Sequence, residues 1–389
     1  HDTLPGDGFR DVLLDATLSF SFSEPVTLAD GWLTISCATT GTHTYVTTNV
    51  PIDFSVNPDT DFVNEEICTA SIDASKVMSI NGAEVMEANA TITFTTIEVN
   101  VCAEDSDWTP IYEIQGSGAS TPMAGYVATR GVVVADFQIS SSLGGVYVQA
   151  PSPGDDNPET SDGIFIYTGV SGFPMSVGEY VRVGGIAQEY NGETEIEALN
   201  ATVCDPSVAV PAHTVLDMPF PAAVGGVDYL ERFEGMLVTF PETLYVTEHF
   251  QLGRFNQVVV SANDRLFQPT HIYAASDPLR AQMQDANNLN RLVLDDPLQT
   301  QNPDPITFGR GGNPLTASNT LRGGDTVTGV AGILTYTDSG NAVSGNMWRL
   351  RNTTTATPPT FVEANPRPAP IARTTSLRVT ALNLLNFFN

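Results

Sequence analysis

The chain has 389 residues and a formal net charge of −29 at pH 7, with 45 acidic residues against 16 lysines and arginines. Such a surface repels polyanions, which excludes a protein that binds nucleic acid or anionic membranes over its whole surface. The sequence also contains no apolar run of about 18 residues, the length that a spanning helix requires, so we expect no membrane span.

Residue usage predicts an all-β protein of two to four domains. Glycine (32) and proline (26) are frequent, and threonine and valine recur in short stretches bounded by turn residues. We predict an Ig-like sandwich over residues 1–100, an OB-fold-like barrel over 101–206 and a second β-rich, OB-like domain over 207–372. Residues 373–389 are interpreted as a linker and the first strand of a domain that follows.

The cysteines and the first residue predict an exported protein. The chain begins at His1 rather than Met, which is typical of a processed protein, so we expect an extracellular or bacterial cell-surface location. Four cysteines allow three disulfide connectivities. We favour Cys37–Cys68 and Cys102–Cys204, with buried free thiols as the alternative, and the sequence has no C-x-x-C spacing that would favour a metal site.

Residues 1–100 contain short alternating segments at 13–22, 32–36 and 90–96, a spacing that is typical of a sandwich. Three stretches and one cysteine carry a family resemblance: FSEPV at 22–26, Cys37, NPDTDF at 57–62 and EICT at 66–69. Through them this part resembles a bacterial Ig-like domain of the SbsA type. The resemblance implies a role in spacing or adhesion, without chemistry.

Residues 101–206 contain five strand candidates separated by glycines, which favours a small closed barrel: 125–137, 145–149, 163–167, 180–190 and 194–198. Loop 151–163 is rich in carboxylates. A calcium site there is one interpretation, but the loop lacks the spacing of an EF-hand, and a solvated loop is the preferred one.

The third unit holds strand candidates and arginines near aromatic residues. The strands are predicted at 236–240, 243–246, 258–261, 291–294, 325–334 and 346–351. Residues 205–389 carry 16 acidic residues and 12 arginines, so any contact with a polyanion belongs there. An OB-like surface binds single strands by stacking bases on aromatics beside cations, and the candidates for nucleic-acid binding are Arg254, Phe255, Trp348, Arg349 and Arg351. The alternative is that these aromatics are core and the arginines pair with acids.

Several stretches from residue 102 onward resemble one family when taken together: IYEIQG at 111–116, SDGIFIYTG at 161–169, LERFEGMLV at 230–238, RLFQPT at 265–270, QNPDP at 301–305, RGGDTV at 322–327 and LRVTALN at 377–383. The combination is similar to the N-terminal region of extracellular endonucleases of the ExeM/NucH type. This resemblance implies that the terminal strand opens an endonuclease/exonuclease/phosphatase domain. There Asn383 would hold a partial catalytic position, and a divalent metal, Mg²⁺ or Ca²⁺, would serve the domain that follows.

The sequence therefore supports two alternative functions. In the first, the chain is the non-catalytic front end of a secreted or surface endonuclease, because metal-assisted hydrolysis needs several converging carboxylates and a base that we do not find here. No cofactor is expected in this chain itself. In the second, it is a processed structural or adhesive surface protein that self-associates by strand pairing through residues 377–389.

Overall fold

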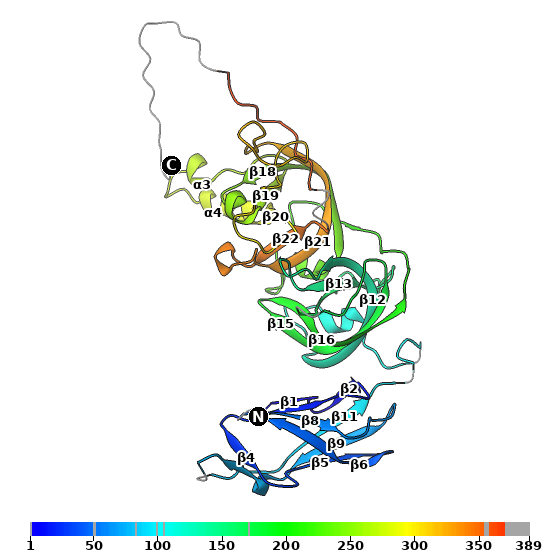
Figure 1. The fold of residues 1–389 in the computed structure, drawn as a ribbon. Helices are drawn as coiled ribbons and strands as arrows, with labels where there is room; N and C mark the ends of the chain where they lie inside the picture. The colour runs from blue at the N-terminus through cyan, green and yellow to red at the C-terminus, as the bar shows by residue number, and fades with distance from the viewer. Residues whose placement is uncertain are drawn as a thin grey trace, which may run out of the picture.

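The computed structural model describes residues 2–49, 52–81, 84–98, 100–103, 106–169, 172–353 and 358–369. Strands dominate these residues, and three β units stand in a row along the chain (Figure 1). The predicted all-β class is confirmed. The nuclease strand position Asn383 and the self-association segment 377–389 lie outside the described residues, so both stay predictions.

The first unit is a sandwich of two sheets. Their strand orders are β1-β3-β8-β7 and β2-β11-β9-β5-β6, and β10 pairs separately with β4. The strand bounds are β1 Asp2–Leu4, β2 Phe9–Val12, β3 Leu18–Ser21, β4 Val26–Leu28, β5 Leu33–Cys37, β6 Gly41–His43, β7 Tyr45–Asn49, β8 Asp53–Pro58, β9 Ile67–Ile72, β10 Val77–Ser79 and β11 Ala90–Thr96, with the short helix η1 at Ala74–Lys76. Alternate residues of β5 are buried, and Trp32 packs against the rings of Phe20 and Phe54 to fill the core.

The second unit is a closed five-stranded barrel in the order β12-β13-β14-β16-β15, with β12 and β15 paired. All neighbours are antiparallel except β14 and β16. The bounds are α1 Ile111–Gln115, β12 Gly125–Phe137, β13 Gly145–Gln149, β14 Gly163–Tyr167, β15 Tyr180–Tyr190 and β16 Glu193–Asp205. Closure leaves no free strand edge in this unit.

The third unit repeats this topology. Its strands run β18-β19-β20-β22-β21, and an additional pairing between β18 and β21 closes the ring, with β17 paired to β18 outside it. In both barrels the third and fifth strands are the parallel pair. The bounds are β17 Thr214–Val215, η2 Tyr229–Phe233, β18 Leu237–Glu248, α2 Leu252–Phe255, β19 Val258–Ala262, α3 Pro269–Ile272, α4 Leu279–Leu289, β20 Leu292–Asp295, β21 Thr326–Thr337, η3 Ala342–Ser344 and β22 Met347–Arg351.

Two features of the third unit differ from the sequence-based expectation. The two strands predicted at 236–240 and 243–246 form one continuous strand, β18, whose register to β21 shifts between Phe240 and Thr243. Pro241 lies at this irregularity, where the strand pairing does not require the backbone N–H that proline lacks. Helix α4 was not predicted; it lies at the surface, and none of its residues is buried.

Candidate functional site

The two barrels share an apolar joint. Strands β12, β13 and β14 are buried on both faces: one set of side chains fills the first barrel, and the alternate set faces outward. The outward set packs against Leu237 and Ile333 of the second barrel: Val134, Ala135, Phe137, Tyr147 and Phe165. The backbones also meet closely, since a Cβ on Gly163 would lie 2.4 Å from the carbonyl carbon of Gly235. This contact explains the uninterrupted apolar runs of these strands.

Polar contacts surround the apolar joint. The Ser161 hydroxyl donates to the Glu234 carbonyl at 2.7 Å, and the Leu237 N–H donates to Gln149 Oε1 at 3.0 Å. At the other side, the β15–β16 hairpin tip reaches the second barrel, because Asn346 Nδ2 donates to the Asn191 carbonyl at 2.7 Å. The joint is therefore fixed by side chains and backbone groups from both barrels.

Two carboxyl groups, one from each barrel, are buried inside this joint. Glu193 at the start of β16 is 5% exposed and accepts a hydrogen bond from the Tyr147 hydroxyl at 2.7 Å. Glu234, just before β18, is 2% exposed, and its Oε1 accepts from the Thr194 N–H at 2.9 Å. Its Oε2 has no hydrogen-bond partner among the described residues. Such a group is costly to ionise, because a single donor, the Thr194 N–H, stabilises the buried charge.

Burial sets the protonation of this pair. It raises the pKa of Glu193 to about 8, with the nearby carboxylate of Glu195 adding to the shift and the Tyr147 hydrogen bond opposing it. Burial, and then the charge of Glu193, hold the pKa of Glu234 well above its ordinary value. The pKa of Glu231 rises to about 7, again through burial. At neutral pH the joint is therefore held in a largely protonated state.

A cleft of about 510 Å³ opens beside Glu193 between the barrels. The first barrel supplies its β12–β13 loop, its β15–β16 hairpin and one face of β14 and β16. The second supplies the end of β21, the loop that follows it, and Gln299 from the loop after β20. The lining residues that carry polar or aromatic chemistry are Tyr167, Gln188, Tyr190, Asn191, Glu193, Glu195, Glu197, Gln299, Tyr336 and Asp338. In OB folds, ligands bind near these same loops, so the cleft is the candidate site of this protein.

A second joint connects the sandwich to the first barrel. Asp11 is 4% exposed and adopts a left-handed backbone conformation with φ of 57°. Its carboxylate pairs with Arg182 at 2.7 Å and accepts from the Tyr126 hydroxyl at 2.9 Å, while its carbonyl accepts from Asn200 Nδ2. Burial, followed by the charge of Asp11, raises the pKa of Tyr126. A buried carboxylate with two partners, together with a third hydrogen bond to the Asp11 carbonyl, fixes the orientation of the two units.

The structure corrects two of the predicted nucleic-acid contacts. Arg349 and Arg351 are fully buried, and both guanidinium groups pair with Asp295, at 3.0 and 3.3 Å. Burial lowers the pKa of Arg349 to about 10 while the Asp295 carboxylate opposes this shift. Leu350 between them fills the barrel core, so the arginines lie on the outer face under covering loops. They stabilise the barrel and are not available to a phosphate group.

The other three candidates are only partly accessible. Phe255 is buried, and Trp348 is half-buried against Tyr336, with ring centroids 5.1 Å apart. Arg254 is exposed; it lies over the Phe255 ring at 4.9 Å and donates to Gln301 Oε1 at 3.0 Å. The structure does not bring the five residues together on one surface, and nucleic-acid binding by Arg254 stays a prediction.

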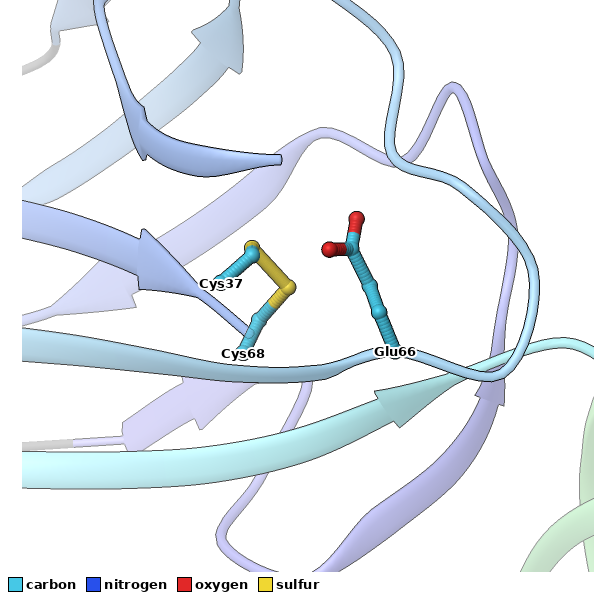
Figure 2. A group of neighbouring side chains, drawn as sticks. All are labelled: Cys37, Glu66 and Cys68. Carbon is cyan, nitrogen blue, oxygen red and sulfur yellow. A yellow bond between two sulfur atoms is a disulfide. The ribbon is translucent and has the colours of Figure 1, made fainter. Parts of the chain in front are cut away.

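Both favoured disulfides are present, Cys37–Cys68 and Cys102–Cys204, and the described residues contain no free cysteine. Cys37 and Cys68 are opposite each other on β5 and β9. Figure 2 shows the Glu66 carboxylate beside this disulfide, and among the described residues this is where cysteine and carboxylate groups come close enough for a metal. Both cysteines form the disulfide and offer no free thiol to a metal. The Glu66 carboxylate already accepts hydrogen bonds from Thr39, Thr40 and Val63. The group is structural.

The acidic loop 151–163 shows no converging set of oxygens among its described residues. Asp155 caps its own turn by accepting from the Asn157 N–H and from the Thr160 hydroxyl. Burial and the neighbouring Asp155 raise the pKa of Asp162 to about 6. These contacts fit the preferred interpretation of a hydrogen-bonded loop.

Sequence reasoning missed the cleft, although one signal was available. Glu193, Glu195 and Glu197 alternate along β16, which places them on one face of the strand. Their cross-strand neighbours Tyr190, Gln188 and Tyr167 complete that face. The Asp11–Arg182 pair had no sequence signal, because its two residues are 171 positions apart.

Comparison with known proteins supports the first unit. Residues 1–96 match the family described as bacterial Ig-like domain, which bears out the Ig-like character predicted there. Residues 201–346 match the family described as "Domain of unknown function (DUF8508)", which covers most of the second barrel. The comparison with curated proteins gave no match. Neither family description names a nuclease, so that resemblance stays a prediction.

Two solved structures were also compared. CopC from Methylosinus trichosporium OB3b is 14% identical with a TM-score of 0.19, over 25% of this chain and 92% of CopC. The N-terminal part of the bacterial S-layer protein SbsC is 11% identical with a TM-score of 0.19, over 45% of this chain and 39% of that one. Likeness at this level says nothing about function.

Within the described ranges, no helix is both long and apolar enough to cross a membrane. Disulfides such as Cys37–Cys68 in the Ig-like unit and Cys102–Cys204 in the first barrel are typical of proteins that reside in oxidising compartments outside the cytoplasm.

Proposed function

We propose that this chain is the non-catalytic front end of an exported protein, in which three rigidly connected β units space and orient a further domain. Following the family resemblance of residues 102–389, that domain is a metal-dependent endonuclease that degrades extracellular DNA. The observation that carries the spacing role is the pair of buried joints, one centred on Asp11 and one on Glu234.

The joints support this role because a flexible connection would not bury charge. The carboxylate of Asp11 gives up its hydration on forming the joint, and Arg182 with Tyr126 replaces it. Removing one partner of such a buried pair costs about 3–5 kcal/mol, because the other charge is left buried without compensation. The paired geometry is met in this orientation of the sandwich, which the joint therefore favours. A rod of this kind keeps whatever follows it at a fixed distance from its amino-terminal unit.

The rigid arm is tested by small-angle scattering of the full chain and of Asp11→Ala. We expect the wild-type profile to fit one extended arrangement and the variant to need an ensemble of sandwich orientations. Asp15→Ala removes an exposed carboxylate four residues away and serves as the control. A wild-type profile that already needs a broad ensemble would exclude a spacing role.

The nuclease assignment needs a separate test on native material. Protein isolated from its source should exceed the 41.5 kDa of this chain and should cleave DNA when Mg²⁺ or Ca²⁺ is present. Native protein of 41.5 kDa without such activity would instead favour the structural, self-associating function.

A further inference from the structure

The inter-barrel cleft has an unusual charge balance. Its wall carries the carboxyl groups of Glu193, Glu195, Glu197 and Asp338, and none of the described residues that line it is a lysine or arginine. The buried carboxylates of Asp11 and Asp295, by contrast, have arginine partners. The cleft therefore lacks the positive charge that normally accompanies buried acids.

Glu195 is the carboxylate of the cleft whose hydrogen bonding is incomplete. Its side chain is 95% buried, because only 5% of the residue is exposed, yet it lines the cleft. One carboxylate oxygen, Oε1, accepts from Gln188 Nε2 at 3.0 Å. The other, Oε2, has no hydrogen-bond partner among the described residues, and it is not sealed away as Glu234 Oε2 is. Burial accordingly raises the pKa of Glu195 above its ordinary value. A cationic donor in the cleft would complete this hydrogen-bond set.

Three tyrosines frame the same cleft. Tyr167 is 37% exposed and lies opposite Glu197 in the β14–β16 pairing, and Tyr190 is 62% exposed and lies opposite Glu193. Tyr336 from the second barrel faces the hairpin tip, where a Cβ on Gly192 would lie 3.0 Å from its ring. Aromatic faces beside carboxylates attract ammonium groups and pack against methylene chains.

The geometry discriminates between an inorganic and an organic cation. The carboxylates of the cleft do not converge, since no three of their oxygens in the described residues come within the 4.8 Å of one another that a metal-ligand set requires. They are spread instead over β16 and the loop after β21, on both sides of a volume of about 510 Å³. This volume lies in the range of small-molecule sites. Separated negative charges fit a ligand with separated positive charges.

We propose that the inter-barrel cleft binds a free, protonated di- or polyamine. Its ammonium groups pair with Glu195 and with the carboxylates of Glu197 and Asp338, and its methylene chain lies along Tyr167, Tyr190 and Tyr336. Because the wall comes from both barrels, a bound amine also ties the two barrels together. This inference does not depend on the proposed nuclease.

The proposal is tested by calorimetric titration of the full chain with spermidine and with putrescine at about 0.1 M salt, where weak surface attraction is screened. We expect saturable one-to-one binding of spermidine. Glu195→Gln should raise Kd about tenfold, the loss expected for one charge-assisted hydrogen bond. Tyr190→Ala, at an exposed position where folding is not at risk, should raise Kd about threefold.

Glu113→Gln is the matched control, since Glu113 is an exposed acid on α1 that does not line the cleft. It removes the same charge and should leave Kd unchanged. Binding that does not saturate, or that weakens equally in Glu195→Gln and Glu113→Gln, would show that spermidine is attracted only by the net charge of −29. Either result would overturn the proposal. Stoichiometric displacement of spermidine by Ca²⁺ would overturn it in favour of a metal site.

Discussion

The stability of the inter-barrel joint should fall as the pH rises from about 4.5 to about 8. Glu193 has a folded-state pKa of about 8 against an ordinary value of 4.5. Because the folded pKa is the higher one, its contribution is fully present below pH 4.5 and is lost as the pH passes through 8. A shift of this size corresponds to roughly 5 kcal/mol. The pKa of Glu234 is shifted in the same direction, so the two effects act together.

The groups around this pair explain why no internal partner cancels the effect. Glu234 faces Glu193, Glu231 and Glu189, which all disfavour its charge, and the Thr194 N–H, which favours it. Glu193 faces Tyr147, Glu195 and Arg351; the Arg351 charge lowers its pKa, but Asp295 already pairs with that guanidinium. Deprotonation therefore places like charges inside a buried contact between two domains.

The assay is urea unfolding at pH 5, 7 and 9 for wild type and Glu234→Gln. Glutamine keeps an acceptor for the Thr194 N–H and cannot ionise, so the variant should lose less stability between pH 5 and 9 and should exceed wild type at pH 9. Hydrogen exchange of the Thr194 amide, corrected for intrinsic rate, reports the same joint locally. Glu113→Gln is the control. Parallel pH profiles for wild type and Glu234→Gln would refute the reasoning.

Three further predictions follow from the same contacts. Replacing Cys102 and Cys204 by alanine should destabilise the chain by about 5 kcal/mol, and replacing Cys37 and Cys68 by about 4 kcal/mol, because the first bond closes the longer loop; the reverse order in urea midpoints would contradict this account. Arg349→Ala should cost about 3–5 kcal/mol by leaving Asp295 short of a partner, whereas Arg254→Ala should change stability by less than about 0.5 kcal/mol. If the second barrel contacts DNA, Arg254→Ala weakens filter retention at low salt, and unchanged retention would remove that contact. The 389-residue chain should not nick plasmid DNA with Mg²⁺ or Ca²⁺, and cleavage above a metal-free control would contradict a non-catalytic role.

Much of the fold could be read from local patterns. The strands predicted at 125–137, 145–149, 163–167 and 180–190 coincide with β12 to β15, because glycine turns bound each apolar run. The Asn191-Gly192 turn between β15 and β16 has positive φ at both residues, which is what a tight hairpin needs. Helix α4 escaped prediction because it is short and contributes no buried residue that would mark a helical period in the sequence.

The candidate site could not be predicted to the same extent. Aromatic and arginine residues near one another in sequence indicated a nucleic-acid surface, yet Arg349 and Arg351 are inside and the cleft lies elsewhere. The alternation of residues 349–351 correctly implies two faces of a strand. Which face meets water depends on the segments that pack over it, and one of these, with Asp295, is 54 positions away in the sequence.

The sequence alone determined the β-rich architecture and favoured the disulfide pairs, because strand periodicity, turn residues and cysteine position are local properties. Tertiary structure decided the rest: it paired Asp11 with Arg182, brought Glu193 to Glu234, and closed a cleft between two barrels. The physical reason is that the desolvation of a side chain depends on its position in the folded structure and not on its residue type. A carboxylate takes part in an inter-domain contact or a binding site only when segments distant in sequence fold over it and exclude water.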